Sequence, residues 1–109
     1  MRKMLGIADE ELLVEDLKDP EFRAEWERTA VAREVAMAVV GYRVEHGLSQ
    51  RALAALLGYR QPQVSRLEDG ETTPSMATLI HVMRQLRLHL SLDIAPDHVV
   101  ARVDELQPA

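Results

Sequence analysis

Two glycines divide the middle of the chain, and their positions limit its fold more than any other feature. Gly58 follows residues 50–57 and Gly70 follows residues 61–69, each at the point where an amphipathic pattern stops. Glycine readily adopts the left-handed conformation that ends many helices. Ser49 precedes the first segment, where its hydroxyl can cap free N–H groups. The pattern therefore predicts two short helices joined by a tight turn.

The apolar positions of these two segments share inward faces. Leu53, Ala54 and Leu57 in the first segment, and Val64 and Leu67 in the second, fall at helical spacing. Two short helices joined by so tight a turn must cross closely, and a small side chain at position 54 permits that approach. The second helix then projects its opposite face outward.

Helices are also expected before this pair. Asp19 and Pro20 favour a helix start. The sequence then runs without a breaker to Val40, and Gly47 ends the stretch. This stretch is read as one long helix or as two helices joined near Thr29. Residues 12–17 are read as a short helix, or as an arm that orders only on binding.

A further helix and then a change of period follow Pro74 and Ser75. The helix has an apolar stripe of Met76, Leu79, Ile80, Met83 and Leu86. Over residues 88–94 leucine and isoleucine alternate with polar residues, which is strand spacing, and residues 99–103 are a weaker strand candidate after a turn at 96–97. A lone strand exposes unpaired backbone groups, so we expect strand 88–94 to pair across a homodimer.

Composition excludes several classes of protein. The chain contains no cysteine, which excludes a disulfide scaffold and a thiol nucleophile. Its four histidines lack metal-ligand spacing, and neither a nucleophile elbow nor a glycine-rich phosphate loop is present. We expect no metal, no cofactor and no catalysis. The longest apolar run, residues 36–42, is too short to cross a membrane, and no signal-peptide pattern opens the chain, so a cytoplasmic protein is expected.

Charge is segregated along the chain, although the total is only −5. Residues 1–27 carry a net charge of −5, residues 28–92 carry +3, and the tail from residue 93 carries −3. A mildly basic centre between two acidic ends indicates that the three parts face different partners.

The segment 48–70 closely resembles the helix-turn-helix of the Xre/Cro/cI repressor family, and the match extends into the helix after Ser75. The two caps, the two glycines and the inward apolar positions carry it. The acidic-aromatic segment 19–27 and the alternating strand resemble HigA-type antitoxins of type II toxin–antitoxin modules. These resemblances imply an all-α, five-helix, lambda-repressor-like domain with a short C-terminal β-strand. The implied parts are an acidic arm (1–27), the DNA-binding domain (28–87) and a dimerisation tail (88–109).

The outward face of the second helix and the resemblance together predict a DNA-binding surface. A helix fits the major groove, where glutamine pairs with adenine and arginine with guanine. The family pattern places base reading at Gln61, and base or phosphate contact at Arg66. Gln50 would present its side chain and free N–H groups to a phosphate. The predicted DNA contacts are Gln50, Arg51, Arg60, Gln61, Gln63, Ser65, Arg66, Thr72 and Thr73.

Several residues depart from the family pattern. Arg60 replaces the usual serine or threonine cap, and Pro62 removes a side chain from a position that often reads bases. Asp69 and Glu71 are acidic where relatives often carry bases, which weakens binding to phosphate. The alternative reading of this face is a solvated surface on a protein-binding module. The family pattern also implies an inward ion pair between Arg43 and Glu68, a structural role.

Phe22 and Trp26 lie four residues apart among glutamates, on one face of a helix. They either cover the domain core or anchor a basic protein partner, with the acids steering the encounter. The resemblance implies as partners a basic, ribosome-dependent RNA endonuclease toxin and a double-stranded operator bound by a homodimer. Two alternatives stay open: a free-standing regulator without a toxin, and a protein-interaction module that does not bind DNA.

Overall fold

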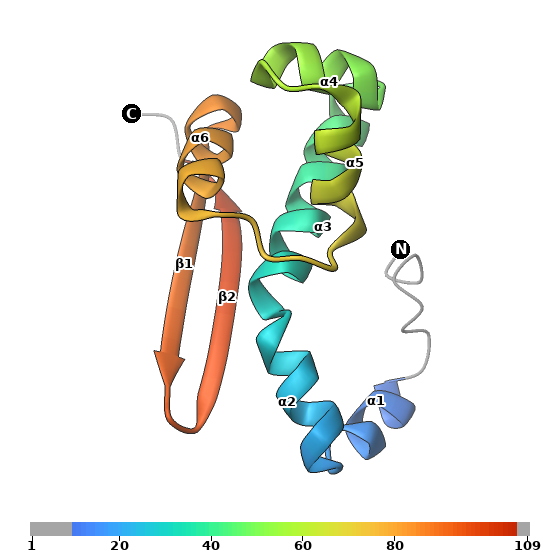
Figure 1. Ribbon diagram of the computed structural model, residues 1–109, viewed down its shortest axis with the longest axis vertical. Helices are drawn as coiled ribbons and strands as arrows, with labels where there is room; N and C mark the ends of the chain where they lie inside the picture. Colours follow the sequence, from blue (N-terminus) through green and yellow to red (C-terminus); the bar gives the residue numbers. More distant parts are fainter. Residues whose placement is uncertain (1–9, 107–109) are drawn as a thin grey trace.

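A computed structural model describes residues 10–106, which form six helices followed by one β-hairpin (Figure 1). The elements are α1 (Glu10–Asp16), α2 (Pro20–Arg28), α3 (Ala30–Glu45), α4 (Gln50–Leu57), α5 (Gln61–Asp69), α6 (Met76–Leu86), β1 (Leu88–Ala95) and β2 (His98–Glu105). The expectation of a mostly helical domain with a C-terminal β element is confirmed. The layout differs from the five-helix prediction, because the described part has six helices and two strands. Residues 1–9 of the predicted acidic arm lie outside the described residues.

The long helical stretch before Gly47 is divided at Thr29, which is the second of the two alternatives. α2 begins after Asp19, whose carboxylate accepts a 3.0 Å hydrogen bond from the N–H of Glu21. The hydroxyl of Thr29 donates to the carbonyl of Glu25 at 3.1 Å. That bond closes the last turn of α2, and α3 starts at the next residue.

Two left-handed glycines end α4 and α5, as the sequence predicts. Gly58 has φ 73° and Gly70 has φ 67°. Gly70 also lies close to α3, since a Cβ at this position would be 3.3 Å from the Cβ of Ala36. Any side chain there would strain both the backbone and the packing of α5 against α3.

An aliphatic core holds α3, α4, α5 and α6 together. Its largest fully buried side chains are Leu53, Leu57, Val35, Val39, Val64 and Val82. The small side chain of Ala54 is 2% exposed, at the crossing of α4 and α5. Within residues 10–106, no helix combines the length and the hydropathy needed to cross a membrane.

The strand β1 pairs with a second strand of the same chain, so it is not the lone strand that the sequence pattern indicates. The expected pairing across a homodimer stays a prediction. β1 and β2 run antiparallel, with Leu88 opposite Glu105 and Ala95 opposite His98. Pro96 and Asp97 form the turn between them. The hairpin lies beside the helices, with β2 against α3 and β1 against α6 (Figure 1). The partner of β1 is therefore the weaker strand candidate of the sequence, whose apolar pattern is interrupted by arginine and acidic residues.

The apolar stripe of α6 is only partly buried, which corrects the sequence prediction. Leu79, Met83 and Leu86 face the core, together with Val82. Met76 and Ile80 are 63% and 44% exposed. The core covers only one side of α6, and the stripe is wider than that contact.

Candidate nucleic-acid interface

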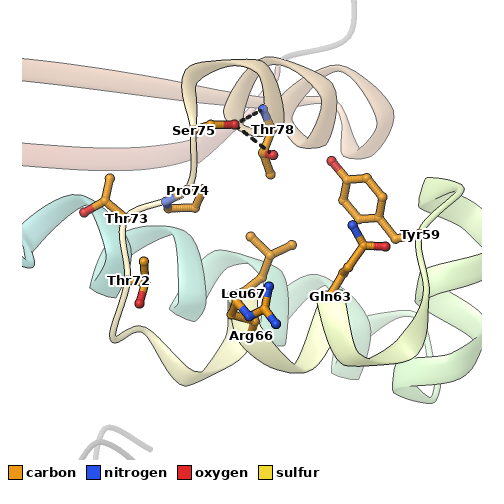
Figure 2. A pocket seen from close by; sticks show the side chains of 9 residues that line it. All are labelled: Tyr59, Gln63, Arg66, Leu67, Thr72, Thr73, Pro74, Ser75 and Thr78. Atoms are coloured by element: carbon orange, nitrogen blue, oxygen red, sulfur yellow. Dashed lines mark hydrogen bonds between the residues drawn. The ribbon is translucent and has the colours of Figure 1, made fainter.

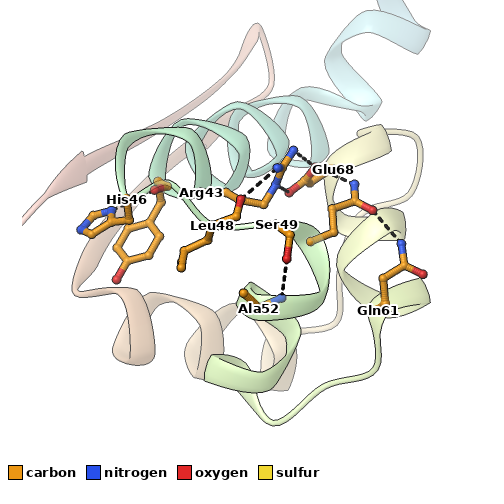
Figure 3. Close-up of polar contacts among 9 residues, drawn as sticks. Arg43, His46, Leu48, Ser49, Ala52, Gln61 and Glu68 are labelled. Carbon is orange, nitrogen blue, oxygen red and sulfur yellow. Dashed lines mark hydrogen bonds and ion pairs between the residues drawn. The ribbon is translucent and has the colours of Figure 1, made fainter.

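A chain of hydrogen bonds connects α3 to the first turn of α5 (Figure 3). Arg43 on α3 donates through Nε to Oε2 of Glu68 at 2.7 Å, and through Nη2 to Oε1 at 3.0 Å. Its Nη1 donates to the carbonyl of Leu48 at 3.2 Å. The side chain of Glu68 is only 7% exposed and that of Arg43 is 22% exposed. The hydrogen bond to Glu68 raises the pKa of Arg43 above its ordinary value, so the guanidinium stays charged.

The chain continues from Glu68 through Gln50 to Gln61. Nε2 of Gln50 donates to Oε1 of Glu68 at 2.9 Å, and Oε1 of Gln50 accepts from Nε2 of Gln61 at 2.7 Å. A carboxylate only accepts, so Glu68 fixes which end of the Gln50 amide faces it. Gln50 then fixes Gln61 in the same way. The Gln61 amide keeps its Oε1 and one N–H for an outside partner.

The first turn of α5 is closed by Gln63 rather than by its N-cap residue. Arg60 makes no side-chain cap bond. Instead, Oε1 of Gln63 accepts a 2.8 Å hydrogen bond from the N–H of Arg60. Gln63 therefore has a structural role beside its predicted base contact, and its oxygen is occupied in the free protein.

The basic side chains predicted to contact DNA are exposed around these two helices. Arg51 lies on the outer face of α4, Arg60 lies before α5, and Arg66 and Ser65 lie on the outer face of α5; all four are exposed. At the N-terminus of α4, Oγ of Ser49 accepts from the N–H of Ala52 at 3.0 Å. The first N–H groups of a helix have no partner within the helix, and such groups suit a phosphate.

A hollow of about 230 Å³ separates α5 from the start of α6 (Figure 2). Gln63 and Arg66 line it from α5, and Thr72 and Thr73 line it from the loop. On its far side Ser75 caps α6, because its Oγ accepts from the N–H of Thr78 at 3.2 Å. The hollow joins the predicted contacts of the helix and of the loop into one surface.

A second cluster lies at the junction of α2 and α3. The rings of Phe22 and Trp26 are stacked at 6.2 Å, and the guanidinium of Arg33 lies 3.4 Å from the centroid of the Trp26 ring. Nη1 of Arg33 donates to the carbonyl of Trp26 and to the hydroxyl of Thr29, both at 2.8 Å. Both aromatic rings are half-buried and lie outside the main core.

Burial near this cluster shifts the pKa values of two neighbouring charged groups. Desolvation lowers the pKa of Arg33, and the adjacent Glu34 partly offsets it. Desolvation likewise raises the pKa of Glu34, and Arg33 partly offsets that shift. The two charges thus partly compensate each other, and both side chains line a hollow together with Trp26, Met37 and Val100.

The basic side chains of α2 and of the loop before it form ion pairs with acidic side chains of α1 and α2. Lys18 pairs with Glu15, Arg23 with Glu27, and Arg28 with Glu25. Because these pairs are exposed, they add little stability. They do leave the other acids of residues 10–28 uncompensated, so the segment presents a negative surface.

Residues 42–92 match the family model described as helix-turn-helix. This part of the chain is a helix-turn-helix domain. Its second helix is α5, and α4 is the helix before the turn.

Two kinds of curated relative are similar to the chain. An uncharacterized HTH-type transcriptional regulator of Haemophilus influenzae is 38% identical over 50 residues, which cover 46% of this chain and 51% of the relative. Antitoxin HigA1 of Mycobacterium tuberculosis is 36% identical over 78 residues, which cover 70% of this chain and 52% of the relative. The chain spans about half the length of these relatives. No solved structure matches it significantly.

The helix-turn-helix domain also uses residues that the sequence does not single out for binding. Tyr59 and Thr78 line the hollow beside Gln63, and Nε2 of His81 donates to the carbonyl of Leu57 at 2.7 Å. His81 also lies 5.2 Å from the Tyr59 ring, which holds α6 against the end of α4. The one sequence feature that indicates these contacts is the isolated tyrosine directly after Gly58.

Proposed function

We propose that this chain is a sequence-specific DNA-binding transcriptional repressor that acts as the antitoxin of a type II toxin–antitoxin module. The observation that carries the DNA-binding part is the hydrogen-bonded chain from Arg43 to Gln61. It presents one acceptor and one donor of the Gln61 amide at the exposed start of α5. That pair matches the N6–H and N7 of adenine in the major groove.

Phosphate contacts complete the proposed interface. Arg51, Arg60 and Arg66 surround the reading amide, and Thr72 and Thr73 supply hydroxyls from the loop. Gln50 contributes through the backbone N–H groups of the first turn of α4, because its side chain is already held between Glu68 and Gln61. Contacts of this kind set position and affinity, whereas Gln61 sets sequence preference.

The antitoxin part rests on the similarity to antitoxin HigA1 and on the charge of the N-terminal segment. The negative surface of α1 and α2 repels DNA and attracts a basic protein. The half-exposed rings of Phe22 and Trp26 add an apolar anchor beside it. We propose a basic toxin as the partner of this surface, with the DNA face left free.

The test is co-expression with the adjacent gene, followed by co-purification and a gel shift on the DNA upstream of the pair. The proposal expects a stable complex and a shift whose strength falls steeply with salt. A shift without any co-purifying partner supports a free-standing regulator, to which the similarity to the Haemophilus influenzae protein also points. A complex without a shift supports a protein-interaction module, which the acidic Asp69 and Glu71 favour.

A further inference from the structure

The hollow beside Arg33 and Glu34 has a volume of about 330 Å³, and we call it the Arg33 hollow. Its apolar wall comes from α1, α2, α3 and β2 and includes Leu13, Trp26, Met37, Val99 and Val100. Arg33 and Glu34 are the two charged side chains that line it. An apolar wall with a few convergent polar groups is typical of a site for a small molecule.

Arg33 is held in one orientation but has no counter-ion in the described part of the chain. Its Nη1 donates to the carbonyl of Trp26 and to the hydroxyl of Thr29, and its guanidinium covers the Trp26 ring. Its Nε and Nη2 make no hydrogen bond to residues 10–106. Arg43, by contrast, is bound by the carboxylate of Glu68. The unused Nε and Nη2 groups of Arg33 form the fork that binds a carboxylate through two parallel hydrogen bonds.

Glu34 supplies the opposite charge, and it too has no hydrogen-bond or ion-pair partner among residues 10–106. Both side chains are half-buried. Desolvation lowers the pKa of Arg33 and raises the pKa of Glu34, as expected of charges that lose water without gaining a full partner. A ligand that carried both complementary charges would replace the lost solvation at each group.

We infer that the Arg33 hollow binds a free α-amino acid with an apolar side chain. The Arg33 guanidinium binds the carboxylate of this ligand, and the Glu34 carboxylate binds its ammonium group. The apolar side chain contacts Met37 and Val100. A phosphate group would be repelled by Glu34, and a wholly apolar molecule would leave both charges without partners.

This site goes beyond the proposed function and does not depend on it. No residue of α4, of α5 or of the loop at 70–75 lines the Arg33 hollow. The hollow is therefore separate from the surface that we propose contacts DNA.

The first experiment titrates the full chain with L-leucine and follows tryptophan fluorescence and isothermal calorimetry. Trp26 is the only tryptophan of the chain and lines the hollow, so its emission reports on this site. Saturable binding is expected, with a dissociation constant below about 1 mM. N-acetyl-L-leucine lacks the ammonium group, L-leucinamide lacks the carboxylate, and L-asparagine has a polar side chain of similar shape. Each of these three probes is expected to bind at least about tenfold more weakly.

The second experiment repeats the L-leucine titration on two variants of the site. Arg33→Lys keeps the charge but loses the fork, and Glu34→Gln removes the negative charge; each is expected to weaken binding by about tenfold or more. Arg28→Lys and Glu45→Gln are the matched controls, since both residues are exposed and neither lines the hollow. Thermal melts of each variant with and without L-leucine check that it folds, and they give a second measure of binding.

A folded parent that shows no saturable binding of L-leucine would overturn the inference. Binding that neither variant weakens would also overturn it, because the ligand would then lie elsewhere. Equal binding of N-acetyl-L-leucine or of L-leucinamide would replace the free amino acid with a simple carboxylate or with the end of a peptide. A gel shift on the same preparation tests the proposed function separately, because operator binding uses none of the residues that line this hollow.

Discussion

Oε1 of Gln50 accepts a 2.7 Å hydrogen bond from Nε2 of Gln61, and this bond orients the amide that we propose reads a base. Gln50 is itself held by Glu68, which accepts from its Nε2. The side chain of Gln61 is therefore already oriented in the free protein. Such preorganisation reduces the entropy lost on binding.

Gln61→Ala is expected to cost about 1–3 kcal/mol of operator binding and to relax the preference at one base pair. Gln50→Ala is expected to reduce the preference at the same base pair, because it frees the Gln61 amide to rotate. The two losses should not add in a double-mutant cycle. Quantitative gel shifts on operators changed at single positions measure both, with the exposed Gln85→Ala on α6 as control. Fully additive losses at two separate base pairs would disprove the coupling.

Arg43→Ala is expected to lower the free energy of unfolding by about 2–4 kcal/mol, because it leaves the carboxylate of Glu68 buried without its partner. Replacing both residues, as Arg43→Met with Glu68→Leu, should cost much less than the single change. Urea denaturation measures these values, with Arg102→Ala as control. Arg102 belongs to an exposed pair with Asp104, so its loss should cost under about 0.5 kcal/mol. An Arg43→Ala variant of parental stability that fails to bind DNA would assign Arg43 to the DNA contact instead.

The helix boundaries around the turn follow from local chemistry, which explains why the sequence predicts them well. Ser49 caps α4, and Gly58 and Gly70 are left-handed at the ends of α4 and α5. Each of these helix ends depends on one residue and its immediate neighbours in the sequence. The partner of β1 depends on a second strand of mixed polarity, so the alternation of residues 88–94 alone does not reveal it.

The candidate site shows the same division between local and tertiary information. The pattern places Gln50 and Gln61 on exposed helix starts, but it does not show that their side chains meet. That contact depends on the angle between α4 and α5 and on a carboxylate eighteen residues beyond Gln50. The exposure of Met76 and Ile80 likewise depends on how much of α6 the core covers, which no helical period specifies.

Stability is expected to fall slightly as pH rises from acid toward neutral, through the titration of Glu34. Burial raises the pKa of Glu34 above 4.5, so the folded protein holds this proton more tightly than the unfolded chain. The stabilising contribution is complete below 4.5 and is lost as pH rises through the folded pKa. Glu34→Gln should therefore melt above the parent at neutral pH and match it in acid. Thermal melts over this range test the sign, with the exposed Glu45→Gln on the same helix as control; a lower melting temperature at neutral pH would contradict it.

Arg87→Gly is expected to stabilise the domain by up to about 1 kcal/mol. Arg87 joins α6 to β1 with φ 56° and ψ 55°, a left-handed conformation that its Cβ disfavours. Glycine removes that strain at a helix end where it is commonly found. Arg84→Gly, inside α6, should instead cost about 1 kcal/mol. Chemical denaturation of both variants measures the difference, and destabilisation by both would show that Arg87 is held by contacts of its side chain.

Phe22→Ala is expected to weaken binding of the adjacent gene product by about tenfold or more while operator binding stays close to that of the parent. The reason is the position of Phe22, half-buried against Trp26, outside the main core and beside the acids of α1 and α2. Trp26→Phe keeps an aromatic ring in the stack and should retain more binding than Trp26→Ala, which also removes the ring beneath Arg33. Val44→Ala, at a 67% exposed position near the end of α3, is the control for a general loss of apolar surface. The measurement pairs a pull-down with a gel shift on the same folded preparation. If the adjacent gene product binds the Phe22→Ala and Trp26→Ala variants as it binds the parent, the two rings serve only to pack α2 against its neighbours. The partner surface must then be sought elsewhere on the molecule.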